Sequence, residues 1–202
     1  RKKDIEAYYA IDSTDSPEII QETRSIPQTS LMQVYFTHTD VKDPKYYALR
    51  VMNAMLGQYS TSLLFQNVRE KNSLCYSIYS NLIAFDGAMG ITTGIEKKDI
   101  DQVLTLIQEQ IETLKNGTFD EELLTVTKTM IINSLKAGDD VMNTMATLRY
   151  QNDLLNREYT SKDIIECIQK VTRADVIEMA QRLEQKTTYI VTSEEGTDEE
   201  NR

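Results

Sequence analysis

The sequence contains a single histidine, His38, among its 202 residues. A zinc-protease motif such as H-x-x-E-H needs two imidazoles on one helical face together with a carboxylate base, so the chain cannot carry one. The same scarcity leaves no evident histidine partner for a serine or cysteine nucleophile. His38 follows a strand-like segment and stands among Thr37, Thr39 and Asp40. We interpret it as a solvated loop residue and expect no metal ligands in this chain.

Cysteine is almost as scarce, and the spacing of Cys75 and Cys167 fits no metal-ligand motif. Two cysteines are too few for the disulfide framework of a small secreted domain, so the sequence favours a reducing, cytoplasmic setting. Long apolar runs are also missing. No window approaches the roughly 18 apolar residues of a membrane span, and no charged start followed by an apolar run indicates a signal peptide. We expect no membrane as a partner.

Glycine and proline number only seven and three, which excludes collagen-like and low-complexity classes. No glycine-rich phosphate loop of the Walker or dinucleotide type is present, so we expect no bound nucleotide. The formal net charge is −10. Because nucleic acids and anionic membranes both favour proteins with an excess of Lys and Arg, this charge argues against either as a partner.

The length fits one ordinary domain with a hydrophobic core of its own. We assign that domain to residues 28–192. Residues 1–27 form a polar lead-in or linker, and because the chain starts with Arg1 rather than Met we expect a piece cut from a longer polypeptide. Residues 193–202 are rich in Asp and Glu. We expect these last residues to be a disordered tail without a role.

The strand signals are short alternations of apolar and polar residues. Residues 32–37 have the period of two that is typical of a strand with one buried face, and the apolar positions are Met32, Val34 and Phe36. The other strand signals lie at residues 74–78, at residues 89–93 after an Asp86-Gly87 hairpin turn, and at residues 187–191.

Helical signals fill most of the remaining chain. The Asp-Pro pair at residues 43 and 44 predicts the start of a helix that Gly57 ends, and a short second helix ends near Arg69. The clearest helical period runs over residues 100–114 and stops at Asn116-Gly117. Thr118 and Glu121 predict a capping box for the next helix. A few strands with helices on one face make an α+β two-layer sandwich with a mostly antiparallel sheet.

Arg69 and Tyr76 are the residues that suggest a chemistry, because they lie seven positions apart where the short helix meets a strand. A guanidinium offers several fixed donors for peptide carbonyls or a carboxylate, and a phenol offers one directed donor for a developing oxyanion. The structural alternative is an arginine paired with a neighbouring acid and a tyrosine ring packed under the sheet. The spacing alone favours that structural alternative.

The run YYALRVMNAMLGQYSTSLLFQNVREKNSLCYSIYS, together with the segments that follow it, resembles the second half of the pitrilysin, insulin-degrading enzyme and mitochondrial processing peptidase family. The resemblance covers roughly residues 31–191 and is nearest to a bacterial branch that includes metal-free members. It implies the metallohydrolase fold shared by LuxS and the mitochondrial processing peptidase. In that family the first half carries H-x-x-E-H and the second half lacks metal ligands.

The resemblance implies that Arg69 holds the substrate backbone and that Tyr76 donates to the scissile carbonyl or the tetrahedral intermediate. Zinc and the catalytic base would come from a homologous half-domain or subunit, so we expect this chain alone to be inactive. Two other hypotheses stay open. The chain could be a catalytically silent scaffold subunit of a heteromeric complex, or a stand-alone module that adds an extended peptide to a sheet edge.

Overall fold

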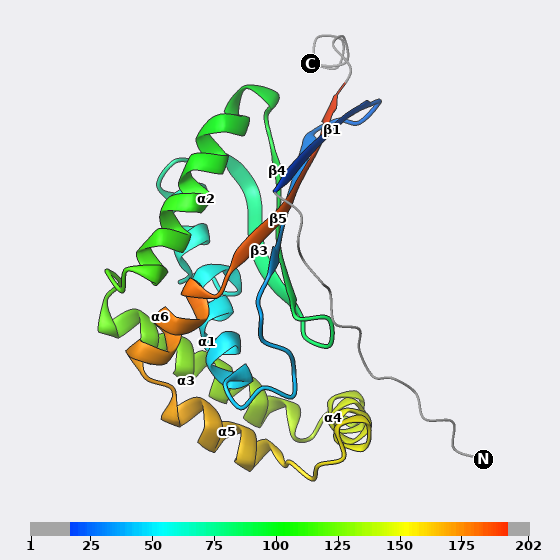
Figure 1. Ribbon diagram of the computed structural model, residues 1–202, viewed down its shortest axis with the longest axis vertical. Coiled ribbons are helices and arrows are strands. Elements are labelled where there is room, and N and C mark those ends of the chain that lie inside the picture. Colours follow the sequence, from blue (N-terminus) through cyan, green and yellow to red (C-terminus); the bar gives the residue numbers. More distant parts are fainter. Residues whose placement is uncertain (1–16, 194–202) are drawn as a thin grey trace, which may run out of the picture.

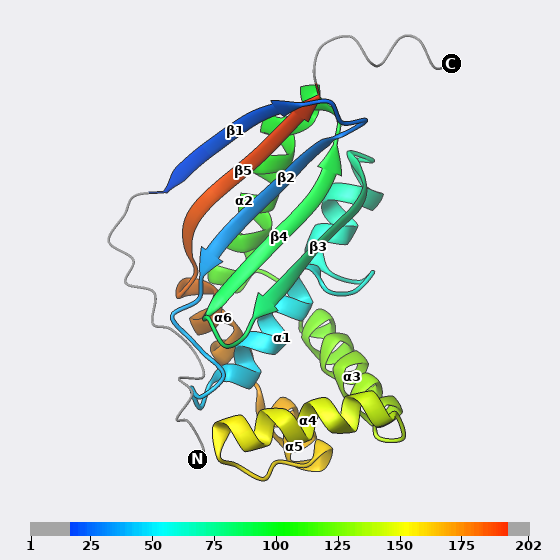
Figure 2. The same ribbon diagram turned by 90° about the vertical axis from the view of Figure 1, so that its right-hand side faces the viewer.

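The computed structural model describes residues 17–193, and its centre is a five-stranded sheet in the order β1-β5-β2-β4-β3 (Figure 2). The pairing of β1 with β5 is parallel, and the other three pairings are antiparallel. The strands are β1 (Glu18–Arg24), β2 (Thr29–Phe36), β3 (Cys75–Ile83), β4 (Ala88–Ile95) and β5 (Glu184–Ser193). The mostly antiparallel sheet confirms that part of the predicted fold class.

The helices form the second layer. Figure 1 shows the sheet nearly edge-on, with α1, α2 and α6 on one of its faces and α3, α4 and α5 beyond one end of the sheet. The helices are α1 (Tyr46–Gly57), η1 (Phe65–Glu70), η2 (Lys97–Asp99), α2 (Ile100–Lys115), α3 (Glu121–Gly138), α4 (Met142–Leu155), α5 (Ser161–Lys170) and α6 (Arg173–Gln181). This arrangement confirms the α+β two-layer sandwich.

The face of β2 that is buried is opposite to the predicted face, which carries Met32, Val34 and Phe36. Leu31, Gln33 and Tyr35 are 0–4% exposed, whereas Met32 is 36% exposed and Phe36 is half-buried. The hydroxyl of Tyr35 donates to Oε1 of Gln33 at 3.0 Å, and Nε2 of Gln33 donates to Oγ1 of Thr188 at 3.4 Å. A period of two shows which residues share a face, but the helices decide which face is covered. Hydrogen bonds then make a buried glutamine tolerable.

Two helix ends differ from the sequence prediction. Thr118 and Glu121 form no capping box, because α3 begins two residues later than predicted, with Asp120 as its N-cap. Gly57 ends α1 without a left-handed conformation, and a Cβ there would lie 2.7 Å from the backbone nitrogen of Ser80. The glycine therefore permits close packing of α1 on β3. Gly117 has a φ of +63° and does end α2 as predicted.

Strand β1 lies within residues 1–27, where the sequence predicts only a polar lead-in. It pairs with β5 from Glu18 opposite Thr187 to Arg24 opposite Ser193. Its alternation is weak because it is an edge strand, and Ile19 is 70% exposed. The predicted acidic tail begins at the last residue of β5, and its remainder lies outside the described residues. Of the helices in the described part of the chain, none has the length and apolar character needed to span a bilayer.

The four methionines that the sequence assigns to core or interface packing divide into two pairs. Met52 and Met55 of α1 are fully buried in the core. Met142 and Met145 of α4 are 84% and 57% exposed. Helical spacing is the same in both pairs, so only the packing of the helices distinguishes the two environments.

Candidate functional site

The predicted site begins in η1, a π-helix in which the backbone nitrogen of Lys71 donates to the carbonyl of Gln66, five residues earlier, at 3.0 Å. Two contacts fix this helix to the core. Val68 is fully buried, and Nδ2 of Asn67 donates to Oε1 of Gln110 in α2 at 2.7 Å. Short π-helices are rare and occur often at functional sites. They widen the helix and so change the directions of its side chains, here that of Arg69.

A tight turn and a β-bulge then determine the position of Tyr76. Ser73 has a φ of +54°, and its backbone nitrogen donates to the carbonyl of Arg69 at 2.9 Å. The pairing of β3 with β4 is irregular between Cys75 and Ile78. A regular strand would place Tyr76 and Ile78 on one face, as the alternation of residues 74–78 predicts. Instead Ile78 is 3% exposed and Tyr76 is 84% exposed, because the bulge reorients the side chains before it.

Arg69 and Tyr76 lie against each other. The Cζ atom of Arg69 is 5.6 Å from the ring centroid of Tyr76 and 4.5 Å from that of Phe65, one helical turn earlier. A guanidinium over an aromatic face gains about 0.5–1 kcal/mol at an exposed site. Sequence reasoning missed Phe65, although its spacing of four residues from Arg69 places the two on one helical face.

The hydrogen-bond donors of Arg69 and Tyr76 have few partners in the described residues. The nearest acid to Arg69 is Glu70, with 3.7 Å between Nη1 and Oε1, and an exposed ion pair at that distance is weak. Neither the guanidinium of Arg69 nor the hydroxyl of Tyr76 has a hydrogen-bond partner within residues 17–193. The tyrosine ring is also exposed rather than packed under the sheet, so the structural alternative fails for Tyr76. The pair can meet a peptide that approaches from solvent.

The other reactive side chains offer no alternative site. His38 is half-exposed, and its Nε2 lies 2.8 Å from Oε2 of Glu184. Cys75 stands near the pair, but burial raises the pKa of its thiol despite the neighbouring Arg69, so the nucleophilic thiolate is disfavoured. Over residues 17–193, no group of three or more His, Cys, Asp and Glu side chains is placed to hold a metal ion.

The comparisons with known proteins all point to relatives of one kind. The family model described as the peptidase M16 inactive domain matches residues 2–131, which includes much of the predicted lead-in. The probable inactive metalloprotease YmfF of Bacillus subtilis is 33% identical over 95% of this chain. The uncharacterized zinc protease YmxG of the same organism is 30% identical over 64% of this chain and 32% of its own length.

A solved structure shows the same fold. A conserved protein from Enterococcus faecalis superposes with a TM-score of 0.89 at 31% identity, over 95% of this chain and 45% of that one. The chain likewise spans 45% of the length of YmfF. The family match over more than half of the chain confirms the resemblance seen in the sequence. This chain belongs to the family of peptidase M16 inactive domains, the C-terminal domains of metalloprotease-like proteins.

Proposed function

We propose that this chain is the metal-free, substrate-clamping half of a zinc-dependent endopeptidase. Arg69 holds the backbone of a bound peptide, and the hydroxyl of Tyr76 donates to the scissile carbonyl as it becomes a tetrahedral oxyanion. The proposal is supported above all by the contact between the two side chains, with 5.6 Å between the guanidinium carbon and the ring centroid. Two neighbouring side chains that both carry donors, one of them highly exposed, suit an extended peptide.

The residues of this chain do not fit a zinc ion. The one histidine of the sequence lies beside Glu184, and the described segment from residue 17 to 193 holds no group of potential ligands. In the proposal, zinc and the general base belong to a homologous half-domain or partner subunit, in a cytoplasmic assembly. An oxyanion donor lowers the activation free energy of such a reaction by about 3 kcal/mol. The isolated chain therefore has no peptidase activity of its own.

Replacing Tyr76 by phenylalanine in the assembled enzyme tests the role of the hydroxyl. The Tyr76→Phe change keeps the ring that stacks on Arg69 and removes only the donor, so kcat should fall at least about tenfold. Arg69→Ala should lower kcat/KM by at least about tenfold because the backbone clamp is lost. Peptide turnover by the purified assembly, measured with an internally quenched peptide, gives both values.

Tyr79→Phe is the matched control, because Tyr79 is also on β3 and is 48% exposed. It removes an exposed phenol hydroxyl from the same strand, and turnover should change by less than about twofold. Equal turnover in the wild type, Tyr76→Phe and Arg69→Ala would reject the clamping role. Equal losses in Tyr76→Phe and Tyr79→Phe would show an effect of the strand rather than of the oxyanion.

A silent scaffold subunit is the second candidate function. It is favoured by the apolar side chains that α4 and the residue before it leave exposed: Val141, Met142, Met145 and Tyr150. Such side chains suit a protein partner. This alternative predicts a tight complex that survives Arg69→Ala and Tyr76→Phe and contains no zinc. Metal analysis of the full-length protein and of its co-purified complex distinguishes the two functions.

A further inference from the structure

A polar cavity of about 350 Å³ lies away from the Arg69–Tyr76 pair, between α1, the C-terminal end of β3 and the segment from α4 to α5. We call it the α1–β3 cavity. Its volume is in the range of small-ligand sites and far exceeds that of one water molecule. The residues that matter for its chemistry are Tyr47, Arg50, Asn53, Asn81 and Arg157.

The cavity is basic within a strongly acidic chain. Its two charged side chains are Arg50 and Arg157, and no Asp or Glu of the described residues lines it. Neither arginine has an acidic partner in the described part of the chain. The Cζ atom of Arg50 lies 5.8 Å from the ring centroid of Tyr47, and that of Arg157 lies 4.7 Å from that of Tyr159. Two guanidinium groups at one cavity provide donors for an anion.

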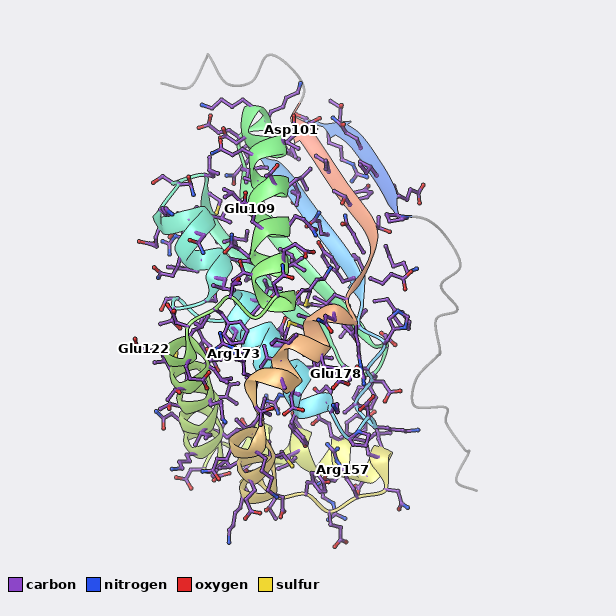
Figure 3. All side chains as sticks on the ribbon, turned by 60° about the vertical axis from the view of Figure 1, so that its left-hand side comes forward. Asp101, Glu109, Glu122, Arg157, Arg173 and Glu178 are labelled. Atoms are coloured by element: carbon purple, nitrogen blue, oxygen red, sulfur yellow. The ribbon has the colours of Figure 1, made fainter. Side chains whose placement is uncertain are left out.

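Arg157, the second residue after the end of α4 (Figure 3), is held in place by Asn152. Its Nε donates to Oδ1 of Asn152 at 3.4 Å, and Nδ2 of Asn152 donates to the carbonyl of Tyr159 at 2.7 Å. Asn152 is 8% exposed. The loop that carries the second guanidinium is therefore ordered by a buried side chain, which lowers the entropy lost when a ligand binds.

Two buried polar atoms at the cavity lack partners. Tyr47 is 7% exposed and Asn53 is 4% exposed, and both line the cavity. Neither the Tyr47 hydroxyl nor Oδ1 of Asn53 has a hydrogen-bond partner within residues 17–193. Buried polar groups without partners are rare in folded proteins because each costs free energy. The Tyr47 hydroxyl can donate or accept a hydrogen bond, whereas Oδ1 of Asn53 can only accept one.

We propose that the α1–β3 cavity binds an α-carboxylate with its neighbouring nitrogen donor, the group found at the carboxyl end of a peptide and in a free amino acid. The carboxylate lies against the guanidinium groups of Arg50 and Arg157 and accepts from the Tyr47 hydroxyl. The neighbouring N–H donates to Oδ1 of Asn53. Such a group offers acceptors to the hydroxyl and to the guanidinium groups and a donor to the amide oxygen.

Other ligand classes fit less well. A metal cation is repelled by two arginines, and sulfate has no hydrogen to donate to Asn53. An apolar ligand would leave the hydroxyl, the amide oxygen and the charges without partners. The inference does not depend on the proposed peptidase role, because binding is measured without zinc and without turnover.

Calorimetry on the full-length protein tests the ligand class. The probes are N-acetyl-alanyl-alanine, its carboxamide, free alanine and sulfate. We expect the free carboxylate to bind at least about tenfold more tightly than the carboxamide or sulfate, since a hydrogen-bonded charge is lost in each case. Comparison of the acetylated dipeptide with alanine tells whether the source is a peptide end or an amino acid.

Three variants locate the binding. Arg50→Gln should weaken binding of the acetylated dipeptide at least about tenfold. Tyr47→Phe should weaken it severalfold while leaving the Tm of the ligand-free protein unchanged or higher, because an unpartnered buried hydroxyl is removed. Arg149→Gln is the matched control, since Arg149 lies on α4 with a side chain that is 74% exposed and pairs with Asp153. Its affinity should equal that of the wild type.

Several results would overturn the proposal. One is no binding of any probe up to about 10 mM. Others are equal affinities for the carboxylate and the carboxamide, or equal losses in Arg50→Gln and Arg149→Gln. A lower Tm of ligand-free Tyr47→Phe with unchanged affinity would also overturn it, because the hydroxyl would then bond a structural water instead of a ligand.

Discussion

Gly57 of α1 lies so close to Ser80 of β3 that a Cβ on the glycine would be 2.7 Å from both the backbone nitrogen and the Oγ of the serine. The hydroxyl of Ser80 in turn donates to the carbonyl of Asn53 at 3.1 Å. This contact fixes the distance between the helix and the edge strand. It also holds together α1 and β3, the two elements that form much of the α1–β3 cavity, and β3 carries Tyr76 of the candidate site.

Gly57→Ala should therefore lower the free energy of unfolding by about 1–3 kcal/mol. The new methyl group meets backbone that cannot move without breaking the sheet, and this overpacking outweighs the better helix propensity of alanine. Urea unfolding followed by circular dichroism measures the difference. Gly138→Ala, where the nearest atom is the Thr144 Cγ2 at 3.0 Å, is the control and should change stability by less than about 1 kcal/mol. Equal losses in both variants would contradict the argument.

The capping box of α6 predicts a pH dependence of stability. The hydrogen bond from the Thr172 hydroxyl lowers the pKa of the Asp175 carboxyl below its ordinary value of 3.8. A carboxyl with a lower pKa in the folded state stabilises the fold at every pH above 3.8, and that contribution disappears as the pH falls through the folded value. Wild-type stability should therefore decrease as the pH is lowered from about 5 to about 2.5.

The Asp175→Asn variant isolates this contribution. It should be less stable than the wild type at pH about 7, and the difference should shrink as the pH falls below about 4. Unfolding in urea over a pH series gives the difference at each point. Asp101→Asn is the control, because Asp101 lies in the first turn of α2 without a capping role. A stability difference between Asp175→Asn and the wild type that does not vary with pH would contradict the role of the charge.

If Arg69 has the proposed function, Phe65→Leu tests whether the ring of Phe65 positions its guanidinium. The change removes the aromatic face 4.5 Å from the guanidinium carbon and leaves an apolar side chain in its place. We expect kcat/KM of the assembled enzyme to fall about two- to fivefold, as the loss of about 0.5–1 kcal/mol of cation–π attraction implies. Phe36→Leu, in β2, should leave turnover unchanged. A loss as large as that of Arg69→Ala would indicate misfolding of η1 instead.

The proposed site could be predicted from the sequence only in part. The seven-residue spacing and the family resemblance identified Arg69 and Tyr76, while their clamping role remains a prediction. Local geometry could not be predicted, because η1 packs on α2 and the bulge between Cys75 and Ile78 lies in the pairing of β3 with β4, and no local pattern specifies either contact. The residues of the α1–β3 cavity escaped sequence reasoning altogether. Arg50 and Arg157 are more than a hundred positions apart and carry no motif.

The sequence by itself determined the kinds of elements, because the periods of 2 and 3.6 residues and the turns at Gly87 and Gly117 are local properties of the chain. Its single histidine also excluded a zinc motif. Only the tertiary structure decided which face of β2 is covered, that residues 18–24 form a strand, and which polar side chains meet. Those outcomes depend on contacts between segments distant in sequence, and no local pattern contains the free energy of such contacts.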